Sequence, residues 1–154
     1  FDDIVLPTDG YNFDGNGNPP PFYASPGDRG RGLFAVRDIK EGELVHDGAI
    51  SDHLFPTGMS WRRLVFNVPI NAACDVIDWT WTQQTEENGE YKLFAPINIS
   101  GLFNGGNKDT MNVNPPTSYS SKFYALRDIM KGEELLTDYD VYDTWWGKVG
   151  LGHI

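Results

Sequence analysis

The sequence predicts a mainly β fold with few short helices, and three observations lead to that fold class. Glycine and proline are plentiful, with 17 and 10 copies among 154 residues, and both are scattered along the chain. This composition favours many short strands joined by turns over long helices. A stretch of about a dozen residues recurs later in the chain, and a central segment alternates between apolar and polar residues. The length fits one domain, since domains commonly contain about 100–150 residues.

The domain organisation follows from changes in composition. Residues 1–26 form a polar lead-in rich in Gly, Asn and Pro. Residues 27–146 are the predicted domain, with a variable insert at about 51–97, and residues 147–154 are a short tail. The chain begins with Phe1 rather than Met, so we interpret it as an excised or processed domain.

Charge and cysteine content limit the partners. Twelve basic and twenty-two acidic residues give a net charge of −10. A negative field disfavours nucleic acid and attracts Lys/Arg-rich peptides, although the same charge also serves solubility alone. A single cysteine, Cys74, excludes an intramolecular disulfide and a Cys-based zinc cluster. It suits a reducing compartment, so we expect an intracellular protein, nuclear or cytoplasmic. No apolar run approaches the roughly 20 residues that span a bilayer, so no membrane contact is expected.

One lead-in segment resembles a calcium loop without meeting its requirements. The segment Asp14-Gly15-Asn16-Gly17-Asn18 has the polar spacing of such a loop. Pro19 occupies the position of the turn glycine, and Ser25 occupies that of the bidentate glutamate. We therefore predict no metal site.

The recurring stretch is the strongest internal signal. Phe34–Val45 is repeated, with small changes, as Tyr124–Leu136. Each copy predicts an apolar strand, a turn built on Arg-Asp-Ile and closed by glycine, and a second short strand. Two copies do not make a solenoid. They predict two similar hairpin corners, from distant parts of the chain, that pack within one fold.

The region between the two copies predicts further elements. Trp61–Phe66 is a short helix or a strand. Cys74–Gln83 alternates like a strand, Glu86–Gly89 is a turn, and Tyr91–Ile99 returns as a second strand. Asn104–Pro116 is polar and rich in Gly and Asn, so it is a loop, and loops of that length are usually functional.

Three segments, taken in order, carry a resemblance to a known family. Gly30–Ile39 begins Gly-Arg-Gly-Leu-Phe-Ala, Leu102–Asn107 reads Leu-Phe-Asn-Gly-Gly-Asn, and Ala125–Tyr139 ends Gly-Glu-Glu-Leu-Leu-Thr-Asp-Tyr. In combination they resemble the SET domain family of protein lysine methyltransferases, over most of the chain. The second segment stands where that family has an Asn-His-Ser-Cys loop, so the histidine that braces the loop is lost. Asn112 is the candidate for the family's second Asn, after a short insertion.

The resemblance implies a β-clip-type fold of several small sheets. In this fold the chain end threads beneath a preceding loop and forms a C-terminal pseudoknot, which is rare among proteins. This would place the loop at Asn104 against Tyr139. The Cys-rich zinc segment that follows many SET domains is absent here. Residues 141–146 are the candidates to close the site instead, with Trp145 or Trp146 against the adenine.

The function implied by the resemblance is methyl transfer from S-adenosyl-L-methionine to a lysine ε-amine. The reaction requires a neutral amine, held in line with the bond that breaks and shielded from water. The implied substrate is a Lys/Arg-rich protein such as a histone tail. Two alternatives remain open: a catalytically silent SET-like module that binds basic peptides, and an unrelated β-clip domain. The second alternative predicts no contact between the Asn104 loop and Tyr139.

The resemblance also assigns candidate site residues. Gly30, Arg31 and Gly32 are cofactor candidates, because a Cβ at either glycine would obstruct a close approach. Asn104 and Gly105 are further cofactor candidates. Tyr139 is a cofactor contact and the catalytic candidate, since a phenol with a pKa near 10 stays a neutral donor and acceptor. Each has a structural alternative: a tight strand entry, a turn-forming Asn, and a buried core Tyr.

The substrate candidates are aromatic, because a lysine stem is readily desolvated along aromatic walls. They are Phe103, Tyr124, Tyr142 and Trp145. His46 stands where the family usually has an aromatic residue before a glycine, so it is the fifth candidate. It could help to take the proton of the amine, or it could be an ordinary surface histidine, and we favour the surface interpretation.

Overall fold

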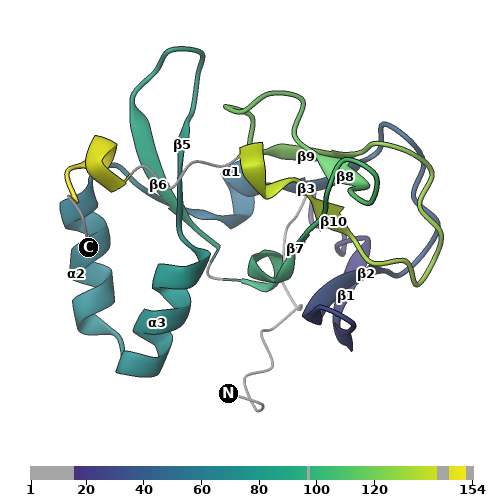
Figure 1. Ribbon diagram of the computed structural model, residues 1–154, viewed down its shortest axis with the longest axis horizontal. Helices are drawn as coiled ribbons and strands as arrows, with labels where there is room; N and C mark the ends of the chain where they lie inside the picture. The colour runs from purple at the N-terminus through teal and green to yellow at the C-terminus, as the bar shows by residue number, and fades with distance from the viewer. Residues whose placement is uncertain (1–15, 97, 142–145, 152–154) are drawn as a thin grey trace.

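The computed structural model describes residues 16–96, 98–141 and 146–151. Within these ranges the fold is mainly β with few helices, as predicted (Figure 1). The strands are β1 (Phe22–Gly27), β2 (Gly30–Ala35), β3 (Leu44–Asp47), β4 (His53–Phe55), β5 (Trp81–Gln84), β6 (Tyr91–Ala95), β7 (Asn104–Gly105), β8 (Val113–Asn114), β9 (Lys122–Ala125) and β10 (Leu136–Thr137). The α-helices are α1 (Gly48–Ser51), α2 (Gly58–Asn67) and α3 (Ile70–Trp79), and short 3-10 turns cover Ile99–Leu102, Tyr139–Val141 and Trp146–Val149.

The strands form several small sheets rather than one large sheet. β1 pairs with β2, and β7 pairs with β10. Two three-stranded sheets have the orders β3-β9-β8 and β4-β6-β5. Figure 1 shows α2 and α3 side by side at one end of the molecule, next to the β4-β6-β5 sheet, with β1 and β2 at the other end. No helix in the described ranges is long and apolar enough to cross a membrane.

The two copies of the recurring stretch pack directly against each other, which confirms the prediction of paired corners. Ile39 and Ile129 exchange both backbone hydrogen bonds, each at 2.9 Å. Gly42 donates to Ala125 at 2.8 Å, and Gly132 donates to Ala35 at the same distance. The two glycines have φ of +77° and +84°, a region that favours glycine. Each corner therefore satisfies the backbone of the other.

The two corners also repeat the same side-chain interaction. Arg37 donates to Glu43 at 2.5 Å within the first corner, and Arg127 donates to Glu133 within the second. These hydrogen bonds from arginine hold the pKa of both carboxyl groups below the ordinary value for glutamate. The matching sequence thus encodes a matching set of interactions.

Two apolar clusters fill the interior. The larger lies around the paired corners and contains Phe22, Leu33, Ala35, Ile39, Val45, Ile99, Phe103, Val113, Ala125, Ile129 and Leu135. The smaller lies between α2, the β4-β6-β5 sheet and the end of the described chain, and contains Phe55, Trp61, Leu93, Ala95 and Leu151. The candidate site lies close to the first cluster, because Phe103 belongs to both.

The central hairpin predicted from Cys74–Gln83 is wrong in its first half. Ile70–Trp79 is the helix α3, and the strand β5 begins only at Trp81. The alternation that predicted a strand is too short to exclude a helical period, and Pro69 immediately before the helix has the φ of −54° that suits a helix start. The turn at Glu86–Gly89 is confirmed by a 3.0 Å hydrogen bond from Gly89 to Glu86.

Other expectations are resolved by neighbouring contacts. Trp61–Phe66 lies in α2, whose start is fixed by a capping box between Thr57 and Ser60. The loop predicted over Asn104–Pro116 contains two short strands, β7 and β8. Strand β1 crosses the predicted boundary at residue 26, and the ring of its first residue packs edge-on against Phe103 at 5.6 Å.

Candidate functional site

The contact between the Asn104 loop and Tyr139 is present. β10 runs parallel to β7, with Leu136 opposite Asn104 and Thr137 opposite Gly105. The chain then turns so that the hydroxyl of Tyr139 donates a hydrogen bond to the carbonyl of Phe103. A Cβ on Gly105 would lie 3.3 Å from the Tyr139 ring, so glycine allows the ring to approach closely. This contact opposes the alternative of an unrelated β-clip domain.

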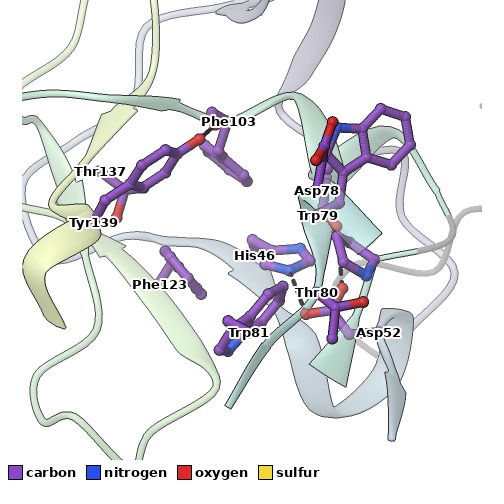
Figure 2. Close-up of a pocket in the computed structure, with 13 residues that line it drawn as sticks. His46, Asp52, Asp78, Trp79, Thr80, Trp81, Phe103, Phe123, Thr137 and Tyr139 are labelled. Atoms are coloured by element: carbon purple, nitrogen blue, oxygen red, sulfur yellow. Dashed lines mark hydrogen bonds and ion pairs between the residues drawn. The ribbon is translucent and has the colours of Figure 1, made fainter. Parts of the chain in front are cut away.

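The environment of Tyr139 keeps its hydroxyl protonated. The residue as a whole is 55% exposed, but its hydroxyl end is turned inward toward Phe103, as Figure 2 shows. Burial at that end raises the pKa of the phenol above its ordinary value of 10.0. At neutral pH the group is therefore a neutral donor and acceptor, as the catalytic assignment requires.

The side chain of Asn104 points toward β2 and binds there. Its Nδ2 atom donates to Glu134 Oε1 at 2.8 Å and to the carbonyl of Arg31 at 3.1 Å. A Cβ on Gly32 would collide with the side chains of Asn104 and Glu134. The glycine at position 32 is therefore required by the protein's own packing. This differs from the interpretation that a bound cofactor requires it.

The other glycine of the motif is needed for its backbone conformation. Gly30 has φ of +88°, and a Cβ built on it would meet no atom within 4 Å. Beside it, the Arg31 side chain is exposed, and no ion pair joins its guanidinium to another described residue. The space beside Gly30 and Arg31 is thus open.

A pocket of about 200 Å³ lies on the other side of Tyr139 (Figure 2). It is smaller than the roughly 300–1,000 Å³ of sites for drug-sized ligands, so it suits a single side chain. Its lining residues are His46, Asp52, Asp78, Trp79, Thr80, Trp81, Pro96, Ser100, Gly101, Phe103, Phe123, Thr137 and Tyr139. Of the predicted cofactor residues, only Tyr139 lines it.

The walls of this pocket are aromatic, but only partly those expected. Phe103, a predicted substrate residue, lines it and stacks on Phe123, with ring centroids 5.7 Å apart and an angle of 12°. Trp79 and Trp81 also line it (Figure 2). Phe123, Trp79 and Trp81 were not among the residues predicted from the sequence. The signal available for the two tryptophans was their position at either side of Thr80, where α3 ends and β5 begins.

The remaining predicted walls are not in this lining. Tyr124 follows Phe123 in β9 and pairs with Leu44. Since successive residues of a strand point to opposite faces, the neighbour of a lining residue faces away from the pocket. Tyr142 and Trp145 lie outside the described residues. Trp146 packs at 5.5 Å from the Trp61 ring, in the smaller apolar cluster, rather than beside the predicted cofactor residues.

His46 lines the pocket and is only 2% exposed, so the surface interpretation is wrong. The pairing of β3 with β9 shifts its register between Leu44 and His46, which marks a β-bulge. Val45 and His46 are consecutive and both buried, the first in the larger apolar cluster and the second in the pocket. The bulge therefore explains how this imidazole reaches the interior, which residue type alone did not reveal.

A buried carboxylate faces this imidazole. The Oδ2 atom of Asp52 lies 3.6 Å from Nε2 of His46, and both side chains are 2% exposed. Ser100 donates to the other carboxylate oxygen at 3.1 Å. Gly48 leaves room for this arrangement, since a Cβ there would lie 2.5 Å from Asp52 Oδ2. The pocket thus combines aromatic walls, a phenol and a histidine–carboxylate pair.

Asn112 braces the site from behind. It is 1% exposed, accepts a hydrogen bond from the backbone of Leu136 at 2.8 Å and donates to the carbonyl of Glu134 at 2.8 Å. These bonds hold β10 where it pairs with β7. Asn112, the candidate for the family's second Asn, thus has a bracing position in this fold.

Comparisons with known proteins agree with this geometry. The sequence model of the SET domain family matches residues 30–140. Among solved structures, Polycomb Repressive Complex 2 of Chaetomium thermophilum bound to GSK126 is 27% identical, with a TM-score of 0.56, over 82% of this chain and 17% of that one. The same complex in an autoinhibited conformation bound to S-adenosylmethionine is 25% identical, with a TM-score of 0.56, over 82% and 16%. The chain therefore corresponds to about a sixth of those proteins.

A further structure shows the same fold at lower identity. ATXR5 in complex with histone H3.1 mono-methylated on R26 is 21% identical, with a TM-score of 0.52, over 82% of this chain and 60% of that one. No curated protein matches the chain.

Proposed function

Since the chain belongs to the SET domain family, we propose that it transfers a methyl group from S-adenosyl-L-methionine to a lysine ε-amine of a basic protein. The observation that carries the proposal is the position of Tyr139. Its hydroxyl is turned inward at one end of a pocket the size of a side chain, and its ring lies against Gly105 in the predicted cofactor loop. Tyr139 therefore contacts both the pocket and the predicted cofactor loop.

The pocket supplies what a lysine side chain needs. The stem would lie between Trp81 and the stacked pair of Phe103 and Phe123, which desolvate it. Aromatic faces also attract the cationic head, by about 0.5–2 kcal/mol. The neutral hydroxyl of Tyr139 would orient the amine without protonating the nitrogen lone pair that attacks the methyl group.

The predicted cofactor residues fit S-adenosyl-L-methionine by their chemistry. The ligand carries a carboxylate and an ammonium group, and it supplies a methyl activated on a sulfonium when bound. The exposed guanidinium of Arg31 suits the carboxylate. The Nδ2 atom of Asn104 is used within the protein, so its Oδ1 atom is the one available to accept from the ammonium. Gly30 leaves open space beside them. One solved relative at 25% identity is bound to this cofactor.

The proposed substrate is a Lys/Arg-rich protein, of which a histone tail is one example. A net charge of −10 attracts such a chain, and Asp52 and Asp78 add carboxylates to the pocket lining. We place the reaction inside the cell, in the nucleus or cytoplasm, where the exposed thiol of Cys74 would stay reduced.

Labelled cofactor and a panel of Lys-rich proteins test the proposal. Tyr139→Phe keeps the ring against Gly105 and removes the hydroxyl, so we expect kcat to fall about 10²–10³-fold, as for loss of one positioned donor. Cofactor affinity, measured by calorimetry, should change little. If the wild type labels nothing in the panel, the enzyme proposal fails. If it also binds no cofactor at millimolar concentration, the silent peptide-binding module is favoured.

A further inference from the structure

We propose that His46, backed by Asp52, accepts the proton that the lysine ammonium must lose before methyl transfer. The inference rests on the proposed function and adds a proton acceptor to it. A free lysine has a pKa of about 10.4, so only about one amine in a thousand is neutral near pH 7.4. A group that takes the proton inside the pocket would remove most of this penalty.

The position of His46 is the first support. The imidazole lines the same pocket as the Tyr139 hydroxyl and is 2% exposed. Its ring lies 5.7 Å from Phe103 and 5.4 Å from Phe123, so the walls that would hold the lysine stem also hold the imidazole. An amine in the pocket could therefore reach it directly or through one water.

The second support is the carboxylate behind it. Nε2 of His46 and Oδ2 of Asp52 are 3.6 Å apart, which is too long for a hydrogen bond but within the distance of an ion pair. A proton arriving on the imidazole would create a cation facing that carboxylate. In a site with little water their attraction is stronger than at the surface. Ser100 keeps Asp52 in place through its other oxygen.

The other charged groups around His46 do not oppose this arrangement. Asp78 contributes a second carboxylate to the pocket lining, from α3. Asp47, the next residue along β3, is engaged elsewhere: it caps α1 through Ala49 and contacts Lys122 of β9 at 3.7 Å. The remaining lining residues are neutral side chains, Tyr139 among them. An imidazolium at position 46 would therefore face negative charge.

The proposed step conserves atoms and charge. One N–H bond of the lysine ammonium breaks, its electron pair stays on the nitrogen, and the proton forms an N–H bond on the imidazole of His46. The pair changes from neutral imidazole and carboxylate to imidazolium and carboxylate. The lone pair left on the lysine is the nucleophile that the methyl transfer consumes.

The pH dependence of methylation distinguishes a proton acceptor from a histidine that only packs. With labelled cofactor and the best protein of the panel, kcat is measured from pH 6.5 to 9.5 for the wild type and His46→Gln. Loss of general-base catalysis costs about 10²–10⁴-fold, so we expect a deficit of that order near pH 7. The deficit should shrink by nearly tenfold per pH unit, because the neutral fraction of free lysine rises at that rate below its pKa of about 10.4.

Two further variants complete the set. Asp52→Asn should give a smaller deficit with the same trend, because the imidazolium loses its counter-charge and the imidazole remains. His53→Gln is the matched control. His53 is an exposed histidine next to Asp52 in sequence, its ring is tilted against that of Phe55, and it is absent from the pocket lining. Its profile should follow the wild type. Cofactor titration and thermal unfolding of each variant check that it is folded.

A measurement on the wild type alone covers the case in which the variants do not fold. A peptide carrying aminoethylcysteine in place of lysine presents a less basic amine. If His46 accepts the proton, the acid limb of kcat stays at the same pH for both substrates. Two results would overturn the inference: an acid limb of kcat whose pH shifts with the basicity of the substrate amine, or a His46→Gln deficit that is constant with pH. Either result leaves the methyltransferase proposal standing. A wild type without methylation activity defeats both.

Discussion

At the scale of single residues, the side chain of Asn112 holds the strand that leads to Tyr139. It satisfies one backbone N–H and one carbonyl of the segment Glu134–Leu136, and it is almost fully buried. Buried polar groups that lose a partner keep their desolvation cost, at about 1–3 kcal/mol each. The side-chain amide of Asn112 thus braces β10.

Asn112→Ala should therefore lower the free energy of unfolding by about 3 kcal/mol, since it leaves two buried backbone groups unpaired. Urea denaturation measures this change. Asn71→Ala makes the same chemical change on the exposed surface of α3 and should stay within about 0.5 kcal/mol of the wild type. A loss below 1 kcal/mol at position 112 would contradict the bracing interpretation.

Single residues also show what a sequence can and cannot reveal. The join between Tyr139 and the Asn104 loop was predictable, because both lie in motifs whose spacing matched a known family. The lining of the pocket was only partly predictable. Trp79, Trp81 and Phe123 reach it through tertiary packing, and nothing in their local sequence distinguishes a wall from an ordinary core residue.

At the scale of elements, the two corners are the feature that sequence predicted best. The repeat was visible because each position has the same task in both copies: the arginine binds the glutamate six residues later, and the glycine turns the chain. The helix α3 was missed for the opposite reason. It belongs to no repeat or motif, and the segment that alternates, Cys74–Gln83, spans the end of the helix and the start of β5.

The arginine–glutamate pairs predict a particular acid response. Because the pKa of Glu43 and of Glu133 is lowered in the fold, their contribution to stability is present above the unfolded value of about 4.5. It is lost as the pH falls through the lowered values. Both pairs are partly exposed, so together they contribute on the order of 1 kcal/mol at pH 7.

Removal of both arginines tests this sign. The double variant Arg37→Ala/Arg127→Ala should have a lower free energy of unfolding than the wild type at pH 7. This difference should narrow when urea denaturation is repeated toward pH 2. Lys131→Ala removes one positive charge from the second corner, and among the described residues no salt bridge involves that side chain. The free energy of unfolding of this control should stay close to that of the wild type at every pH. If the difference between the double variant and the wild type widens on acidification, the arginine–glutamate pairs are not its cause.

At the scale of the whole molecule, the two apolar clusters stabilise different parts of the fold. The larger one lies around the corners, while the smaller one packs α2 against the last described residues. The smaller cluster also reaches the pocket lining, where the Nε1 atom of Trp61 donates to Thr80 at 3.0 Å. Gly58 allows the last described residues to approach α2, since a Cβ at position 58 would lie 2.7 Å from the Leu151 side chain.

Leu151→Ala should therefore reduce the free energy of unfolding by about 2–4 kcal/mol, the usual cost of a buried leucine. Cofactor affinity in calorimetry should stay unchanged, because the predicted cofactor residues belong to the region of the larger cluster. Met59→Ala is the control, a 59% exposed side chain on α2. Loss of cofactor affinity in Leu151→Ala would show that the clusters act as one unit.

The mutual pairing of the corners has a consequence for biosynthesis. Several peptide groups of the first corner, those of Ile39 and Gly42 among them, find their partners in the second. Lys40 and Asp128, which join the two corners, are 88 positions apart. During translation, the early half leaves the ribosome with open strand edges and an apolar surface that nothing yet covers. Such edges recruit other chains. We expect a polypeptide truncated before residue 124 to aggregate or to require a chaperone, and co-expression of the missing corner to restore solubility.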